Sequence, residues 1–220
     1  MISSAGLRPD DKLFKLFRSG KQMSYKKSEQ ILPGDTTHVF MIEKGFVRAY
    51  TINNRGDQFT HVVFTGYDMF PAFRVFDGDE ELFYEALSVT TVYALPRADL
   101  VQLVRTDLLA SNNLLRITTR QTRILADRVR NLEFRYAPER IIFRLLVMAE
   151  RFGEERQDGS YYIDAPISQP VIATAVNASR ESVSRTMENL KVTGLIDYNS
   201  RHLVIHDIKA LRDRINISDN

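Results

Sequence analysis

The polar residues with the most specific chemistry lie between positions 168 and 202 of the 220-residue chain. Arg180, Glu181 and Arg185 fall on neighbouring turns of one expected helix. An arginine can donate two hydrogen bonds to guanine O6 and N7, and a glutamate can accept one from cytosine N4. Nearby hydroxyl, amide and imidazole groups suit phosphates or base edges. The predicted DNA contacts are Ser168, Gln169, Ser179, Arg180, Glu181, Ser182, Ser184, Arg185, Arg201 and His202.

Two helices and the turn between them must position this set. Ser168 is suited to cap a first helix that runs to about Val176. Asn177 follows where the turn requires left-handed backbone, which asparagine tolerates better than most residues. Ser179 then caps a second helix, which ends at Gly194. This order predicts a helix-turn-helix whose second helix enters the major groove of DNA.

A predicted hairpin follows the second helix. The runs Leu195–Tyr198 and His202–His206 flank a turn at 199–201, which completes a winged helix-turn-helix. By itself, the pattern from Arg180 to Arg185 also suits a solvated helix face with local ion pairs. The elements around it favour DNA. The alternative is a regulatory or scaffold protein that acts through protein–protein contacts, but such an interface is usually less charged at its centre.

A long helix is expected from about Leu108 to Tyr136. Its apolar residues recur at spacings of three, four and seven, as in a coiled-coil seam between two chains. The alternative is that this stripe packs on its own domain. Ala137-Pro138 interrupts the helix and marks a domain hinge, because proline disfavours helical geometry in the residue before it. The predicted dimer seam is Leu114, Ile117, Gln121, Ile124, Leu125, Val129 and Leu132.

Short strands with frequent turns are expected from Tyr25 to Leu95. The turn Asn53–Asp57 joins the runs 46–52 and 59–64 as a hairpin. Evenly spaced, β-branched and aromatic strands of this kind predict an antiparallel β-roll of the jelly-roll type. The expected fold class is α+β, with the roll at 1–106, a dimerisation helix at 107–137 and the winged helix-turn-helix at 138–220.

Composition excludes several other classes of protein. The chain is 44% hydrophobic, carries a net charge of +2 and has no cysteine. Disulfides, thiolate-bound zinc and cysteine-ligated iron–sulfur clusters are therefore excluded. The apolar runs are too short to cross a membrane and the N-terminus lacks a signal-peptide pattern, so we expect a cytoplasmic protein. No glycine-rich phosphate loop, nucleophile elbow or cluster at metal-ligand spacing indicates an enzyme or a metal site.

These segments together resemble the Crp–Fnr family of bacterial transcription regulators over nearly the whole chain. The strands from Tyr25 to Leu95, with Ile-Leu-Pro-Gly-Asp at 31–35 and Phe-Met-Ile-Glu-Lys-Gly at 40–45, resemble its cyclic-nucleotide-binding-type roll. The long helix resembles its dimerisation helix. The motif Ser-Arg-Glu-Ser-Val-Ser-Arg at 179–185 resembles its recognition helix.

The resemblance implies a homodimer on double-stranded DNA, with a two-fold operator and half-sites like TGTGA, and RNA polymerase as a further candidate partner. Arg180 is similar to the cyclic-AMP-receptor-like subclass, whereas Ser184 is similar to the Fnr-like subclass, whose half-site differs. Cyclic-nucleotide binders of the family carry a Gly-Glu and a later Arg-Ser/Thr-Ala cassette. The matching residues 66–73 and 79–83 hold no arginine at the phosphate position, and Glu80 and Glu81 would repel an anion. The resemblance thus implies control by something other than cyclic AMP.

No cofactor is predicted, and the effector stays open. Haem held by His38 or His61, an apolar ligand, and control by the abundance of the protein alone are the alternatives. Aromatic residues of the roll either fill its core or line a ligand pocket. The candidate pocket residues are Phe64, Tyr67, Phe70, Phe73, Phe83 and Tyr84.

Overall fold

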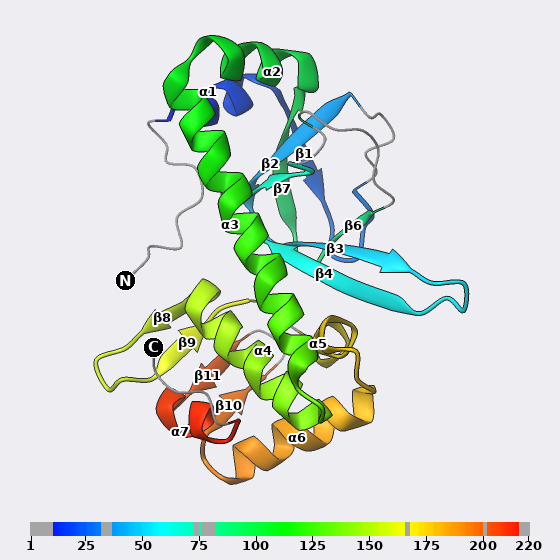
Figure 1. The fold of residues 1–220 in the computed structure, drawn as a ribbon, viewed down its shortest axis with the longest axis vertical. Coiled ribbons are helices and arrows are strands. Elements are labelled where there is room, and N and C mark those ends of the chain that lie inside the picture. Colours follow the sequence, from blue (N-terminus) through cyan, green and yellow to red (C-terminus); the bar gives the residue numbers. More distant parts are fainter. Residues whose placement is uncertain are drawn as a thin grey trace. The chain divides into compact units, whose positions relative to one another are not determined.

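The computed structural model describes residues 11–31, 37–72, 75, 82–165, 168–199 and 202–215 (Figure 1). The chain forms two compact units, and the division between them falls within a long helix, between Leu125 and Ala126. The long helix was predicted to continue to Tyr136 with a domain hinge at Ala137-Pro138; it ends instead at Glu133, and Ala137 and Pro138 begin the next helix. Among the described residues, no helix is long and apolar enough to cross a bilayer.

The N-terminal unit combines antiparallel strands with helices. The described elements that begin in it are α1 (Lys12–Ser19), β1 (Lys21–Tyr25), β2 (His38–Lys44), β3 (Val47–Ile52), β4 (Gln58–Phe64), β5 (Met69–Phe70), β6 (Phe83–Ala86), β7 (Thr90–Pro96), α2 (Arg97–Thr106) and α3 (Leu108–Glu133). One sheet has the strand order β1-β7-β2-β5 and another the order β4-β3-β6.

Strand β2 contributes to two hydrophobic cores. Val39 and Met41 pack with apolar side chains of α1, α2 and the first half of α3. Phe40 and Ile42 pack with side chains of β3 and β4 from the other sheet. Successive side chains of a strand point to opposite faces, so one strand can connect both cores. Helices cover one face of the first sheet and the second sheet covers the other, which confirms the predicted roll.

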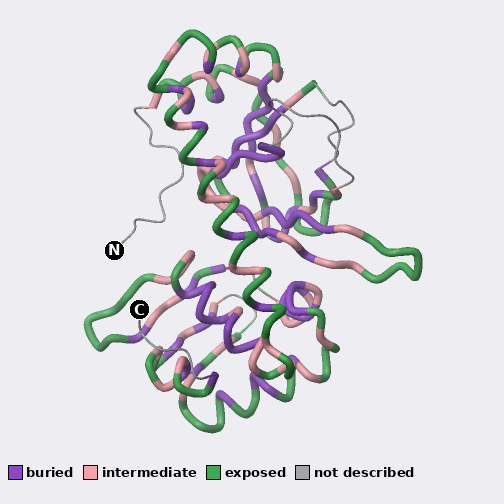
Figure 2. The backbone as a smooth tube through the Cα atoms, viewed as in Figure 1, coloured by how far each residue is buried: buried purple, intermediate pink, exposed green. Residues whose placement is uncertain are grey.

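The predicted hairpin at Asn53–Asp57 is confirmed. Strands β3 and β4 pair in antiparallel register from Val47 opposite Phe64 to Ile52 opposite Gln58. The amide of Asn53 donates to the backbone oxygen of Asp57 at 3.0 Å, which closes the turn. The tip of this hairpin is exposed (Figure 2).

The C-terminal unit contains the winged helix. Its described elements after α3 are α4 (Ala137–Phe152), β8 (Gly153–Glu155), β9 (Tyr161–Ile163), α5 (Gln169–Val176), α6 (Arg180–Val192), β10 (Ile196–Tyr198), β11 (Leu203–Ile205) and α7 (Ile208–Asp213). The strands form one sheet in the order β10-β11-β9-β8. The predicted pair of helices, α5 and α6, and the hairpin after them are confirmed. Helices α1 and α7 and strand β8 were not predicted.

The predicted dimer seam on α3 needs correction. Leu114 and Ile117 are only 5% and 7% exposed and pack against α1 and α2, while Ile124 is 5% exposed and packs in the core shared with β3 and β4. The side-chain amide of Gln121 donates to the backbone oxygen of Met69 at 2.7 Å. This face of the helix is therefore covered by its own unit, as in the alternative interpretation.

Other positions of α3 leave large apolar side chains in solvent. We call this set the exposed stripe; it consists of Leu108, Leu115, Leu125, Val129 and Leu132. Its last three members are four and three residues apart, which places Leu125, Val129 and Leu132 on one side of the helix. Leu125, Val129 and Leu132, at 47%, 62% and 60% exposure, are the part of the predicted seam that remains available to a partner.

Candidate DNA-binding interface

Helix α6 presents one polar face to solvent. Ser179 caps its N-terminus, since its Oγ accepts a hydrogen bond from the amide of Ser182 at 3.1 Å. The predicted contacts that are exposed on this helix are Arg180, Glu181, Ser184 and Arg185. Its buried side chains are Val183, Thr186, Met187 and Leu190. The inward face predicted for this helix is thus confirmed, and its opposite face is free to meet a partner.

The turn before α6 has the expected backbone. Asn177 adopts φ 51° and ψ 57°, the left-handed conformation predicted for this position. The amide of Ala178 donates to the backbone oxygen of Ala173 at 3.1 Å, which fixes the end of α5. Because α5 and α6 meet at this turn, its conformation sets the direction in which α6 leaves it.

Two arginines outside α5 and α6 hold this turn in place. Arg140 on α4 donates from Nε to the backbone oxygen of Val176 at 2.9 Å and from a terminal nitrogen to that of Asn177 at 3.2 Å. Its other terminal nitrogen donates to the backbone oxygens of Phe134 and Arg135. Carbonyl groups at the end of a helix have no partner within the helix, so an arginine fork is an effective cap for them. Arg140 thus joins the segment before α4 to the helix-turn-helix.

Arg128 on α3 forms a hydrogen bond with the backbone carbonyl of the residue before Val176. It donates to the backbone oxygen of Ala175 at 2.9 Å, and burial lowers its pKa from the ordinary arginine value. Arg128 lies 47 residues before its acceptor and Arg140 lies 36 residues before Val176. No local sequence signal marks such distant pairs, which explains why the sequence analysis missed both arginines.

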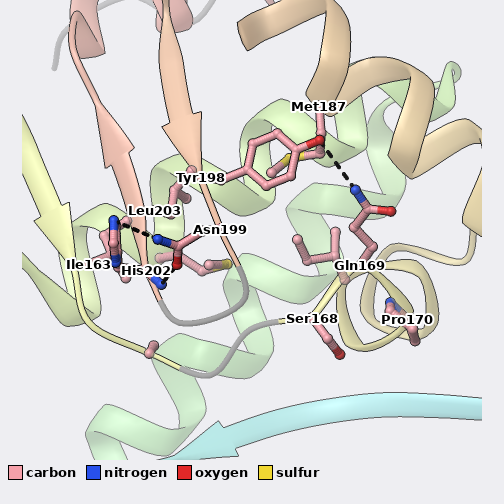
Figure 3. A pocket seen from close by; sticks show the side chains of 12 residues that line it. Ile163, Ser168, Gln169, Pro170, Met187, Tyr198, Asn199, His202 and Leu203 are labelled. Carbon is pink, nitrogen blue, oxygen red and sulfur yellow. Dashed lines mark hydrogen bonds between the residues drawn. The ribbon is translucent and has the colours of Figure 1, made fainter.

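The remaining predicted contacts come from the start of α5 and from the wing. Ser168 and Gln169 begin α5, and His202 directly precedes β11 (Figure 3). The Nε2 atom of Gln169 donates to the hydroxyl of Tyr198 at 3.4 Å. The amide of His202 donates to the side-chain oxygen of Asn199 at 3.0 Å. Arg201 lies outside the described residues.

Comparison with known proteins agrees with this geometry. Residues 139–214 match the model of the Crp-like helix-turn-helix domain. A CRP-like cAMP-activated global transcriptional regulator of Mycobacterium tuberculosis is 31% identical over 104 residues, which are 47% of this chain and 46% of that protein. The matched stretch therefore spans about half of that relative. The global nitrogen regulator of Synechocystis is 26% identical over 195 residues, covering 86% of this chain and 85% of the relative.

Solved structures share the fold over nearly the whole chain. FixK2 from Bradyrhizobium japonicum aligns with a TM-score of 0.77 at 23% identity, covering 91% of this chain and 98% of that one. A CooA mutant from Carboxydothermus hydrogenoformans aligns with a TM-score of 0.78 at 19% identity, covering 98% of both chains. The chain thus carries a Crp-like helix-turn-helix domain at residues 139–214, and its fold is shared by these structures.

The predicted effector-pocket residues do not surround one space. Phe70 stacks between Phe64 and Tyr84, with ring centroids 5.6 Å and 5.1 Å apart, inside the core shared by the two sheets. Tyr67 instead packs edge-on against Phe14 of α1 at 5.4 Å. Phe83 is 41% exposed. Phe73 lies outside the described residues. The positions of the described aromatics favour the alternative interpretation, in which they fill the core.

The histidines considered as haem ligands lie on strands of the roll. His38 begins β2 and contacts Thr37, while His61 lies on β4 and its Nε2 is 2.8 Å from the hydroxyl of Thr51. Among the described residues, no group of three or more histidine, aspartate or glutamate side chains is placed to hold a metal ion.

Three residues belong with the candidate interface although the sequence analysis omitted them. Glu188 and Asn189 are exposed and line a shallow depression on α6 together with Glu181, Ser184 and Arg185. They lie three or four residues after Arg185, so helical spacing was a sufficient signal. Lys191 pairs with Asp197 of β10 at 3.2 Å and thereby lowers the pKa of that carboxyl. This pair ties the end of α6 to the wing.

Proposed function

We propose that the protein is a sequence-specific DNA-binding transcription regulator of the Crp–Fnr type. The observation that carries the proposal is the exposed face of α6, where Arg180, Glu181 and Arg185 lie on the first turns of a helix capped by Ser179. In a helix-turn-helix, residues at the start of the second helix contact base edges in the major groove. The arginines suit guanine and Glu181 suits cytosine, so a half-site close to TGTGA fits these three side chains.

The proposed active form is a homodimer. Large apolar side chains seldom form a continuous exposed patch unless another molecule covers them. The exposed stripe on α3 has the three- and four-residue spacing of a coiled-coil seam. Two copies joined along α3 would present two recognition helices to half-sites about one helical turn apart, as a two-fold operator requires.

We further propose that the roll responds to a signal other than cyclic AMP. Arg48, the buried arginine on β3, is already engaged: its terminal nitrogen lies 2.6 Å from Glu85 and 2.7 Å from Gln58. This guanidinium is therefore poorly placed to receive the phosphate of a cyclic nucleotide.

A signal within the roll could reach α3 through two contacts. Arg120 pairs with the buried Asp68 at 3.1 Å, and Gln121 bonds to the backbone of Met69. Both partners lie at the start of β5: Asp68 directly precedes it and Met69 is its first residue. A ligand that binds one arrangement of this segment better than another would shift the population of α3 positions. DNA affinity would then change with the signal, although the recognition helix itself is unaltered.

Selection of operators from a random pool of duplex DNA tests the core of the proposal. We expect the full-length protein to enrich a palindrome with arms like TGTGA. Binding to that palindrome should weaken steeply as the salt concentration rises, because phosphate contacts release counterions. Cyclic AMP should leave the affinity unchanged. Enrichment of unrelated sequences would overturn the half-site, and affinity that is indifferent to both sequence and salt would overturn DNA binding.

A further inference from the structure

A cavity of about 340 Å³ lies inside the C-terminal unit, beneath the two helices of the helix-turn-helix (Figure 3). Its apolar wall comes from four elements: Met148 on α4, Ile172 on α5, Met187 on α6, and Ile163 and Leu203 on the sheet. These five side chains are nearly inaccessible to solvent, with exposures of 6% or less. The cavity therefore reaches into the hydrophobic core of the unit, while its polar rim is partly exposed.

Water is a poor occupant for a cavity of this kind. At roughly 30 Å³ per molecule, the volume corresponds to on the order of ten waters, and each ordered water needs two to four polar partners. The polar partners in the described lining lie at the rim, and the inner wall is apolar. An apolar molecule would instead gain free energy by leaving water for this site.

The polar groups at the rim define the chemistry of that molecule. None of the described lining residues is an aspartate, glutamate, lysine or arginine. Gln169 and Tyr198 face one another across one side and are joined only by the long 3.4 Å hydrogen bond (Figure 3). Asn199 and His202 form the opposite side, with their side-chain nitrogens 3.1 Å apart. The described residues of the rim can accept or donate a hydrogen bond, and none of them carries a formal charge at neutral pH.

From this combination of an apolar wall and an uncharged polar rim, we infer that the cavity is a binding site for a small, uncharged, largely aromatic or aliphatic molecule with one hydrogen-bonding group. Met148 and Met187 are suited to such a site because the flexible thioether adapts to ligands of different shape and contacts aromatic rings favourably. This site is separate from the roll, where the resemblance to cyclic-nucleotide-binding proteins would place an effector.

Occupancy of the cavity changes the DNA-binding surface directly. Met187 is on the inner face of α6, opposite Arg185. Gln169 and His202 are themselves predicted DNA contacts. A ligand that bonds to the rim changes the orientation of these side chains, so it alters operator affinity without any signal from the roll.

Methyl NMR of the full-length protein tests the site without requiring DNA. The chain has six methionines, and Met148 and Met187 line the cavity whereas Met41 and Met69 are buried in the N-terminal unit. With methionine methyl groups labelled with carbon-13 and assigned through Met148→Leu and Met187→Leu, indole is added as the probe. We expect saturable shifts of the Met148 and Met187 signals and none for Met41 or Met69. Benzene, which lacks a hydrogen-bonding group, should bind more weakly.

A cavity-filling variant and a matched control complete the experiment. Ala165 lines the cavity and is 4% exposed, so Ala165→Leu should weaken indole binding about tenfold or more. Ala98→Leu, at an exposed position of α2, should leave it unchanged. Unmoved Met148 and Met187 signals at the highest soluble indole concentration would overturn the proposal, as would equal shifts of all four methionines. If Ala165→Leu is unfolded, Ile172→Phe takes its place. Because binding is measured on the free protein, failure here is distinct from failure of DNA recognition.

Discussion

The side chain of Arg140 caps the end of the first helix of the helix-turn-helix by donating from Nε to the backbone oxygen of Val176 at 2.9 Å. The same guanidinium reaches the oxygen of Asn177 at 3.2 Å, so both residues that begin the turn are held by one side chain of α4. The angle between α5 and α6 thus depends on a residue that lies on neither helix.

Arg140→Ala should destabilise the C-terminal unit by about 1–3 kcal/mol, because four backbone oxygens lose a charged donor. Arg140→Lys should recover only part of this loss, since an ammonium group lacks the planar fork. Urea denaturation followed by circular dichroism measures the change. Arg135→Ala, at an exposed position, is the control and should be neutral. Equal stability of the Arg140 and Arg135 variants would contradict the capping role.

Arg180→Ala should weaken binding to the selected operator by about 1–3 kcal/mol and relax the preference at a single position of each half-site. The reason is that its guanidinium is exposed, and we propose that it contacts a base edge. Fluorescence anisotropy with the operator and with single-base variants provides the measurement. Lys209→Ala removes one exposed positive charge from α7 instead of α6. It should change neither the operator affinity nor the base preference. If the variant binds all operator sequences more weakly by the same factor, Arg180 contacts a phosphate instead of a base.

Local patterns were sufficient to predict most of the C-terminal unit. Asn177 is left-handed and Ser179 is a cap because each effect depends on neighbours within a few residues. The hairpin at Asn53–Asp57 was predictable for the same reason. The C-terminal helix α7, capped by Asp207 through the amide of Ala210, also carried a local signal and could have been found.

The features that the sequence did not predict depend on tertiary packing. Helix α3 carries two apolar stripes with the same spacing, one containing Leu114 and the other containing Leu115, and their positions in the sequence do not reveal which one the roll covers. Arg120 and Arg140 were indistinguishable from other helical arginines, because their acceptors lie far away in the chain. The cavity beneath the helix-turn-helix is likewise invisible in the sequence, since it arises from packing between four elements.

The two stripes of α3 should respond differently to substitution. Val129→Glu introduces a charge at a side chain that is 62% exposed, so it should leave the monomer folded and abolish the dimer. Leu114→Ala removes buried methyl groups and should cost about 2–5 kcal/mol of stability while leaving the dimer contacts in place. Analytical ultracentrifugation and thermal unfolding separate the two effects. If the Val129→Glu protein remains dimeric, the exposed stripe does not form the dimer seam.

Arg144 provides a test through pH. Burial, together with the nearby charges of Arg151 and Arg128, lowers the pKa of Arg144 to about 9. The folded protein therefore bears the cost of a partly buried cation below pH 9, whereas the unfolded chain carries the same charge in water. Above pH 9 the folded state releases a proton that the unfolded state still holds, so stability rises with pH in that window.

Replacing this side chain with an uncharged one of similar length should accordingly stabilise the protein. We expect Arg144→Met to raise the free energy of unfolding by about 1–3 kcal/mol near neutral pH, because the cost of burying the cation disappears. The advantage over the unmodified protein should shrink at about pH 10, where the folded unmodified protein has released the proton. Urea titrations of both proteins at the two pH values measure the difference. Arg123→Met, at an exposed position of α3, is the matched control and should show neither effect. An advantage that stays constant with pH would attribute the gain to packing rather than to charge.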